Sequence, residues 1–289
     1  MSHRIAWLDV FAERPLAGNA LVVVDDADGI ADETMLALAR ELNLSETTFV
    51  QKPDADGADY RNRIFTIERE IPFAGHPSLG TAVAVAGWRG LEEASLVQET
   101  VAGLQPIEVR ADGDRWRAEM VQNAAEFGTE LDSEAVMHAV GLSSAEAHQN
   151  LAPRVVSTGL PTAIVPVADA SSLARAVPDL EAIDAALRDA EPRAGETPNF
   201  YLVWVDAEGG QARARMFSGG APGGEDPATG SAAGPLCAYL AERADCERLV
   251  IRQGEEMGRP SLLEVEMVDG RPRVGGGVIP VIEGEVSLT

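Results

Sequence analysis

The sequence has 289 residues, of which 45% are hydrophobic, and its formal net charge is −24. So much negative charge repels polyanions, which excludes nucleic acid and anionic membranes as partners. The length suits two domains of ordinary size, and no apolar run reaches the roughly 18 residues that span a bilayer. We therefore expect a globular, cytoplasmic protein, and the charge does not exclude a small anionic substrate.

The first half of the chain begins with two strands around a turn. Apolar patterning predicts strands at residues 5–10 and 21–24, joined through the turn Ala17-Gly18-Asn19. A helix near residues 31–42 and a strand near 47–51 follow. The second half of the chain can be compared with this order of elements.

The second half repeats the order. Strands at 154–157 and 162–167 flank Gly159-Leu160-Pro161, followed by a helix near 179–189 and a strand near 200–205. A match over so long a period predicts two similar domains and not a solenoid of short repeats.

The domain boundary is predicted near residue 125, where polar segments surround a short helix at 134–140. The first domain would cover residues 1–125, to which the last strand, 278–289, can return, and the second would cover 126–277. The chain ends in strands near 262–267 and 277–281, and the Asp269-Gly270 pair between them favours a hairpin.

One short motif occurs twice. GHPSLGTA at residues 75–82 returns about 150 residues later as EDPATGSA at 225–232, with Pro, Gly, a hydroxyl residue and Ala in register. Each copy is typical of a helix start, with His76 or Asp226 as the cap and Pro at the first helical position. Small apolar residues follow on every face, which predicts two buried helices. Their N-termini are expected to converge on an anion.

Other chemistries have little support in the sequence. Cys237 and Cys246, the two cysteines, lack the spacing of a metal site and are too few for a disulfide framework, so we expect ordinary buried thiols. His3, His138 and His148 have no partner at ligand spacing, and we expect no metal. The glycine-rich segment 219–224 lacks the Lys-Ser/Thr ending of a phosphate-binding loop, and no G-x-S-x-G elbow is present.

Several strings together resemble the signature of the phenazine-biosynthesis PhzF-like isomerases. They are LDVF with GNA (8–11 and 18–20), NLSET (43–47), PFAGHP (72–77) and EDPATGS (225–231). The resemblance covers nearly the whole chain. It implies an α+β fold like that of diaminopimelate epimerase, with two similar domains, each a strongly curved sheet around a central helix. It also implies an active site in the cleft between the domains, no cofactor, and a homodimer.

The resemblance assigns roles to individual residues. It implies that Glu46 is the acid/base that shuttles a proton, and that His76 and Asp226 contact the substrate and support proton movement. Without it, Glu46 is one acidic residue among 47 and the residues favour a solvated carboxylate at a strand start, whereas His76 and Asp226 are equally simple helix caps. The residues implied to bind substrate are Ser231, Gly75 and Gly230.

These observations predict a cofactor-independent isomerase that acts on a small carboxylate-bearing metabolite by general acid/base proton transfer. Two alternatives stay open: an amino-acid epimerase or racemase that uses one base, and a small-acid binding protein without catalysis. Racemases related to this fold use a cysteine at each helix start. Both motifs here are free of thiols, which disfavours two-thiol racemisation. The substrate is chosen by loops such as 52–62 and 158–162, which carry no readable code.

Overall fold

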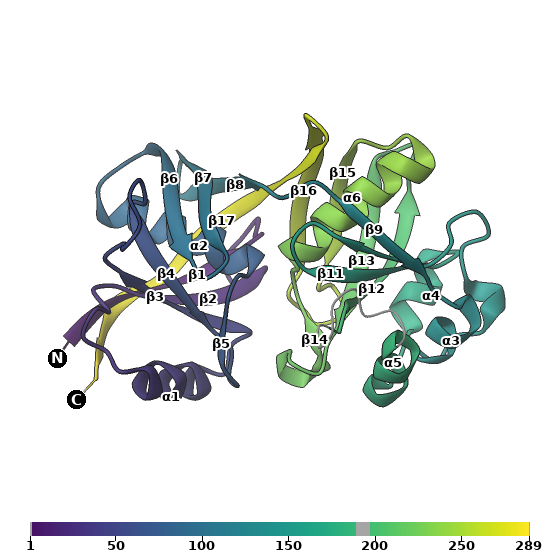
Figure 1. Cartoon of the computed structure of the whole chain (residues 1–289), viewed down its shortest axis with the longest axis horizontal. Coiled ribbons are helices and arrows are strands. Elements are labelled where there is room, and N and C mark those ends of the chain that lie inside the picture. The colour runs from purple at the N-terminus through teal and green to yellow at the C-terminus, as the bar shows by residue number, and fades with distance from the viewer. Residues whose placement is uncertain (1, 189–196, 289) are drawn as a thin grey trace. The chain divides into compact units, whose positions relative to one another are not determined.

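The computed structural model describes residues 2–188 and 197–288. The chain divides into two compact units (Figure 1). The first unit is Met1–Val121 with Gly275–Thr289, and the second is Gln122–Val274. Each unit contains its own buried apolar cluster and is described by itself. That independently folding domains end at residues 125 and 277 stays a prediction.

The first unit is a closed eight-stranded barrel. Its strands are β1 (Ser2–Val10), β2 (Asn19–Val24), β3 (Glu46–Gln51), β4 (Tyr60–Phe65), β6 (Glu93–Thr100), β7 (Gly103–Asp112), β8 (Arg115–Val121) and β17 (Arg271–Ser287). Pairing runs from β17 through β1, β2, β3, β4, β6, β7 and β8 and returns to β17. The yellow C-terminal strand therefore lies among the strands of the N-terminal half in Figure 1. Closure leaves a central space that a helix fills.

Helix α2 (Gly75–Trp88) occupies the barrel interior. It contacts the strands β1, β2, β3, β4, β6, β7 and β8, and its residues from Gly75 to Ala86 are all buried. Small side chains make this possible. A Cβ added at Gly80 would lie 2.6 Å from Leu21 Cδ2 and 2.9 Å from Val10 Cγ2, closer than real side-chain contacts allow. The prediction of a buried helix is confirmed for this copy of the motif.

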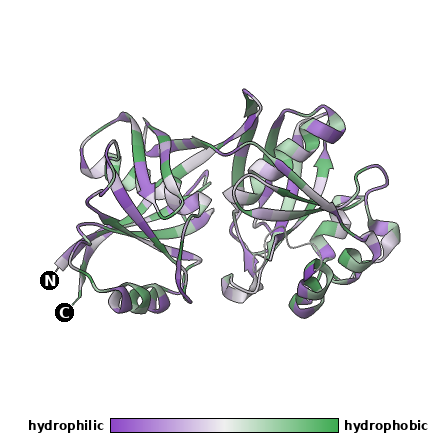
Figure 2. Cartoon of the chain, viewed as in Figure 1, coloured by the Kyte–Doolittle hydropathy of each residue, from purple (hydrophilic) through white to green (hydrophobic). Residues whose placement is uncertain are grey.

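Helix α1 (Asp32–Leu42) covers the outside of the barrel and connects β2 to the parallel strand β3. Met35 and Ala39 face the protein, and the opposite face is charged, so the helix shows both purple and green sides in Figure 2. The buried face packs with Phe49 and Phe65, whose rings meet edge to face at 5.4 Å.

The second unit repeats the pairing of the first. Its elements are β9 (Glu126–Glu130), α3 (Ser133–His138), η1 (Ser144–Glu146), β10 (Arg154–Ser157), β11 (Pro161–Pro166), α4 (Ala170–Arg175), α5 (Leu180–Leu187), β12 (Asn199–Asp206), β13 (Gln211–Phe217), η3 (Pro222–Gly224), β14 (Glu225–Asp226), α6 (Gly230–Ala244), β15 (Arg248–Gln253) and β16 (Ser261–Val268). Helix α6 contacts β10, β11, β15 and β16, and most of its residues are buried. It is the counterpart of α2.

The two units share one strand plan. In the first, β1–β2 is antiparallel, β2–β3 parallel, β3–β4 antiparallel and β4–β6 parallel, and the short strand β5 (Glu70–Ile71) pairs with β4. In the second, β10–β11, β11–β12, β12–β13 and β13–β15 follow the same order, and β14 pairs with β13. The predicted duplication and the α+β class, a curved sheet around a central helix in each half, are confirmed.

Most predicted elements appear within a residue or two of their expected ends. The Asp269-Gly270 turn has φ of 50° and 74° at its two residues, the left-handed pair that tight hairpins need. The predicted helix at 179–189 is α5, and its expected last residue, Asp189, lies outside the described residues. Within 2–188 and 197–288, no helix combines the length and apolarity needed to cross a bilayer.

One local prediction is wrong. Within the described residues, neither buried helix has a side-chain cap, and neither begins with Pro at its first position. Helix α2 begins at Gly75, one residue before His76. Helix α6 begins at Gly230, four residues after Asp226, because Asp226 is held in strand β14 by pairing with Met216. The two copies of the motif therefore match in sequence, but the helix begins at a different position within each copy.

Candidate active site

Glu46 is the first residue of strand β3, where it pairs with Leu21 of the parallel strand β2. Its side chain is only 16% exposed, and Oε2 lies 3.4 Å from Nε2 of His76. The solvated-carboxylate interpretation is therefore wrong for this residue. The separation is longer than an ordinary hydrogen bond of about 2.7–3.2 Å, and catalytic pairs in ligand-free enzymes often have this loose geometry.

His76 is oriented from the other side of its ring. Asn19 Nδ2 lies 3.2 Å from His76 Nδ1, and an amide NH₂ can only donate, so Nδ1 is the acceptor. The ring proton of the neutral histidine then sits on Nε2, the atom that faces Glu46. Burial lowers the pKa of His76 to about 3, so the ring is neutral at physiological pH.

Asn19 is a site residue that the sequence interpretation did not single out. It is the first residue of β2 and follows Gly18, whose φ is +66° and whose position allows no side chain, because a Cβ would lie 2.3 Å from Val10 O. The same loop is fixed where Asp9 Oδ2 accepts the N–H of Leu16 at 2.6 Å. The Gly-Asn-Ala string was the available signal, and the structure places its amide against His76.

A buried polar chain holds the first turn of α2. Ser78 Oγ donates to Ala74 O at 2.7 Å and accepts from Gln98 Nε2 at 2.7 Å. Gln98 Oε1 in turn accepts from Asn62 Nδ2 at 3.0 Å. Asn62 of β4 and Gln98 of β6 thus hold the first turn of α2, which carries His76, through hydrogen bonds. These bonds limit how far the ring can move relative to Glu46.

In the second unit, Asp226 lies before α6 and is 5% exposed. Its Oδ2 accepts the hydroxyl of Thr229 at 2.5 Å, and Gln253 Nε2 donates to its backbone carbonyl at 2.8 Å. Ser231 is the second residue of α6 and is half-buried. Asp226 therefore belongs to a local network with Thr229 and Gln253, two residues that the sequence interpretation did not select.

The two predicted glycines both lie at helix N-termini. Gly75 and Gly230 are the first residues of α2 and α6, both in the right-handed helical conformation and both buried. Their contribution is therefore the absence of a side chain at each helix N-terminus, not a special backbone angle.

Among the described residues, no group of three His, Cys, Asp or Glu side chains is placed to hold a metal ion. Both cysteines are buried and free. Burial raises the pKa of the Cys237 thiol to about 12. A thiol held so firmly in its protonated form is a poor base at neutral pH.

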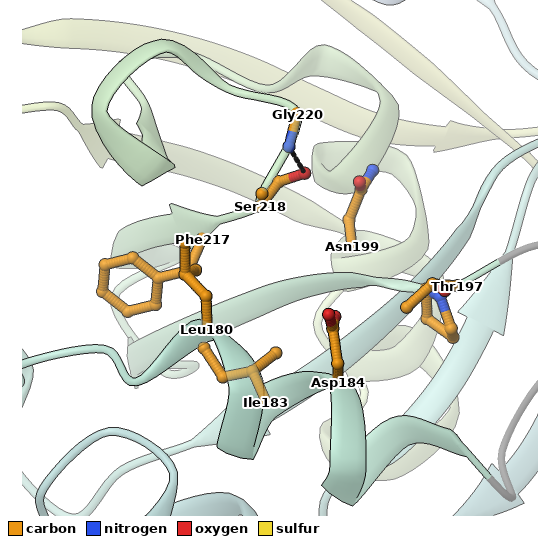
Figure 3. A pocket seen from close by; sticks show the side chains of 10 residues that line it. Leu180, Ile183, Asp184, Thr197, Asn199, Phe217, Ser218 and Gly220 are labelled. Atoms are coloured by element: carbon orange, nitrogen blue, oxygen red, sulfur yellow. Dashed lines mark hydrogen bonds between the residues drawn. The ribbon is translucent and has the colours of Figure 1, made fainter.

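A separate hollow of about 220 Å³ lies in the second unit between α5 and the loop after β13. Figure 3 shows Asp184 and Asn199 at this hollow, with Ser218 Oγ accepting the N–H of Gly220 at 3.2 Å. None of the described residues that line this hollow is a predicted site residue.

A barrel closed around a central helix, a second unit that repeats its strand plan, and a half-buried carboxylate beside a neutral histidine are the features to compare with known proteins. The family model for phenazine biosynthesis-like proteins matches residues 8–284, and the chain belongs to this family. A trans-2,3-dihydro-3-hydroxyanthranilate isomerase from Pseudomonas aeruginosa is 36% identical, with 90% of this chain and 88% of the relative covered. An uncharacterized isomerase from Mesorhizobium japonicum is 35% identical, with 97% of both chains covered. The class of this enzyme is therefore isomerase.

Among solved structures, a predicted epimerase from Pseudomonas aeruginosa is similar to this chain. It has a TM-score of 0.83 and 39% sequence identity, and the comparison covers 99% of this chain and 100% of that one. The fold and the family agree with the resemblance found in the sequence motifs.

Proposed function

We propose that this enzyme is a cofactor-independent isomerase that moves a proton between two carbon atoms of a small carboxylic acid, with Glu46 as the acid/base. The observation that carries the proposal is the 3.4 Å approach of Glu46 Oε2 to His76 Nε2 inside one barrel. Both side chains are shielded from water, so a proton held there exchanges slowly with solvent and can return to the substrate.

The proposed reaction has two steps. In the first, ionised Glu46 takes a proton from carbon, the C–H bond breaks, and its electron pair delocalises into the adjacent unsaturated or carboxylate-bearing system. In the second, the same carboxyl group returns the proton to a different carbon, a new C–H bond forms, and the double bond has moved. Atoms and electrons balance without an oxidant or a reductant.

His76 has the right chemistry to support both steps. Its Nε2–H, fixed by Asn19 on the far side of the ring, is a neutral donor to Glu46 or to a substrate oxygen. A donor that does not itself titrate near pH 7 keeps the same hydrogen-bonding role as Glu46 gains and loses its proton.

The remaining site residues are proposed as substrate contacts on the strength of the family resemblance. Asp226 would accept an N–H or O–H of the substrate, and Ser231 would bind its carboxylate. The helix N-termini at Gly75 and Gly230 would offer backbone N–H groups to an anion.

The substrate class is proposed from the curated relatives. One of them is named for trans-2,3-dihydro-3-hydroxyanthranilate, a cyclic amino acid that carries a carboxylate, an amine and a hydroxyl group. A compound of this kind provides an acidic carbon and the polar groups that Asp226 and Ser231 would bind. A role in phenazine synthesis does not follow from the shared catalytic centre.

The second candidate is epimerisation of an amino acid by one base, which is favoured by the similarity to a predicted epimerase. The thiols argue against the two-cysteine form of that reaction, because Cys237 is buried in the middle of α6 and both motifs are free of cysteine. One-base epimerisation by Glu46 would return the proton to the same carbon on the opposite face.

The test is to incubate the enzyme with trans-2,3-dihydro-3-hydroxyanthranilate, and separately with L-proline, and to follow the products by NMR. We expect a shifted double bond, and we expect Glu46→Gln to lower kcat at least about a thousandfold while the folded state persists. The exposed Glu41→Gln variant is the matched control and should have wild-type activity. Inversion at an α-carbon would support the epimerase. Tight binding without any product, or full activity in Glu46→Gln, would overturn the proposal.

A further inference from the structure

A chain of buried polar side chains in the second unit leads to Asp226. Tyr201, Gln253, Thr229 and Asp226 are 0%, 1%, 6% and 5% exposed, and they come from β12, β15 and the segment before α6. Buried polar groups are costly unless they are bonded to one another, so this arrangement requires an explanation. Apolar residues would have filled the same space at less cost.

The orientation of the Gln253 amide is fixed at both ends by backbone groups. The N–H of Thr229, which can only donate, lies 3.2 Å from Oε1, and the carbonyl of Asp226, which can only accept, lies 2.8 Å from Nε2. A flipped amide would place donor against donor and acceptor against acceptor. Tyr201 must therefore donate its O–H to Oε1, at 3.0 Å.

The direction of the next bonds follows. The second N–H of Gln253 donates to Thr229 Oγ1 at 3.0 Å, so the hydroxyl hydrogen of Thr229 is directed to Asp226 Oδ2 at 2.5 Å. Each side-chain donor in the series, from Tyr201 through Gln253 and Thr229, points toward the carboxylate. Hydrogen bonds that end on a carboxylate stabilise its ionised form and fix its orientation.

Two features keep this chain in place. Burial raises the pKa of Tyr201, and the nearby charge of Asp226 raises it further, so the phenol remains a donor. At the end of β15, a Cβ added at Gly254 would lie 2.6 Å from Pro227 O and 2.4 Å from Arg259 O. The turn after Gln253 is therefore packed directly against the backbone that follows Asp226.

We propose that Gln253, Thr229 and Tyr201 form a positioning relay that holds Asp226 as an oriented, ionised acceptor for an ammonium or hydroxyl group of the substrate. The relay rests on the proposed function for its use, but its geometry belongs to the second unit alone. Gln253 is its central member, because it contacts each of the other three residues. These are positioning residues, and Asp226 is the group that would touch substrate.

The relay can be tested without turnover by ¹³C NMR. In protein labelled at the aspartate carboxyl carbon, the Asp226 signal is assigned by its loss in Asp226→Asn, and its titration is followed with pH. We expect the midpoint to rise by about one pH unit in Thr229→Val, which keeps the shape and removes the donor, and to return to the wild-type value in Thr229→Ser. Tyr201→Phe, which removes a single oxygen, should give a smaller rise. Wild-type titration in both Thr229→Val and Tyr201→Phe would overturn the proposal.

Turnover of trans-2,3-dihydro-3-hydroxyanthranilate supplies the second readout. We expect Thr229→Val to lower kcat/KM roughly tenfold to hundredfold and to move the acidic limb of its pH profile upward, with Thr229→Ser restoring both. A variant with a shifted titration but wild-type kcat/KM would contradict a positioning role. Failure of the proposed function would be seen instead as full activity in Glu46→Gln, which leaves the titration unaffected.

Discussion

The two units carry the same hairpin immediately before their buried helices. In the first, Arg63 Nε and Nη2 bind both oxygens of Glu70 at 2.8 and 2.6 Å, and the guanidinium lies 5.2 Å from the ring of Phe65. In the second, Arg215 binds both oxygens of Glu225 at 2.9 and 2.8 Å. The same arginine lies 4.9 Å from its own phenylalanine ring. The duplication has kept a fork-to-fork ion pair at the point where β4 and β13 turn toward the active-site motifs.

The two arginines differ in what else they hold. Arg63 Nη1 reaches the exposed Asp32 in the first turn of α1, at 2.7 Å. Arg215 Nη1 instead donates to carbonyls at the end of α4, those of Leu173 and Ala176, at 3.3 and 2.8 Å. The hairpin is therefore shared, whereas its contacts with the neighbouring helices differ. The contact of Arg63 with Asp32 is solvated, and the contact of Arg215 with the α4 carbonyls is buried.

The predicted site residues differ more between the two units. The first unit presents a neutral histidine beside a carboxylate, whereas the second presents a carboxylate at the end of a series of donors. Under the proposed function, the residues of the first unit would move the proton and Asp226 of the second would accept hydrogen bonds. Substitutions in the two units measure how far they have diverged, beginning with the shared hairpin.

The largest effect is expected from Arg215→Met. The substitution leaves Glu225 and the α4 carbonyls without their buried partner, which should lower the free energy of unfolding by about 3–5 kcal/mol. Arg63→Met should cost less, about 2 kcal/mol, because Glu70 and Asp32 are more exposed and regain water. Urea denaturation of both variants measures the difference. Equal losses would show that the extra carbonyl contacts of Arg215 contribute nothing.

A somewhat smaller effect is expected from Gly18→Ala. The added methyl group would overlap Val10 O and the φ of +66° disfavours alanine, so we expect a loss of about 2–4 kcal/mol and a displaced Asn19. Gly57→Ala is the matched control, since Gly57 also has positive φ but has nothing within 4 Å. It should cost about 1 kcal/mol and leave activity unchanged. Thermal unfolding and kcat of the two variants decide the point.

The third prediction concerns pH. The pKa of His76 is about 3 in the folded protein and near 6.5 when unfolded, so below pH 6.5 the unfolded chain binds a proton that the folded one does not. Stability should therefore fall with decreasing pH, and between pH 7 and 5 the wild type should lose about 2 kcal/mol relative to His76→Asn. The exposed His138→Asn variant should follow the wild type. A constant difference between wild type and His76→Asn would contradict a buried neutral ring.

The smallest effect is expected from the threonine pair that joins α2 to β3. Thr48 Oγ1 and Thr81 Oγ1 are 2.8 Å apart and fully buried, so either single change to Val should cost about 1–2 kcal/mol by leaving one hydroxyl unsatisfied. The double variant should recover part of this loss. In a double-mutant cycle, simple additivity of the two single losses would argue against the bond.

Much of the fold could be predicted from the sequence, because strand alternation and small-residue helices report burial directly. The repeated order of elements, the buried character of α2 and α6 and the Asp269-Gly270 hairpin all followed from such local patterns. Strands β4 to β9, strands β13 to β15 and helix α4 were not predicted. The sequence analysis allowed the last strand to return to the first domain, but the register in which β17 pairs with β1 could not be predicted, since it joins residues separated by most of the chain.

The candidate site was predictable only in part. Motifs pointed to Glu46, His76 and Asp226, and the structure brings the first two together. Asn19 was missed although its Gly-Asn-Ala string was part of the resemblance. Gln253 and Tyr201 were missed because their contribution depends on the direction of hydrogen bonds, which no sequence pattern encodes. The cap interpretation of Asp226 was wrong because a short strand pairing with β13 takes precedence over the Pro signal. The homodimer and the cytoplasmic location stay predictions.

The division of roles between the halves is tested most directly by hydrogen exchange at the substrate carbon. In deuterium oxide, with trans-2,3-dihydro-3-hydroxyanthranilate as the probe, mass spectrometry of the recovered compound reports exchange in each variant. We predict no incorporation above background with Glu46→Gln, and slower but clear incorporation with Asp226→Asn at saturating probe. Incorporation at the wild-type rate in Glu46→Gln, or its complete loss in Asp226→Asn alone, would contradict the account.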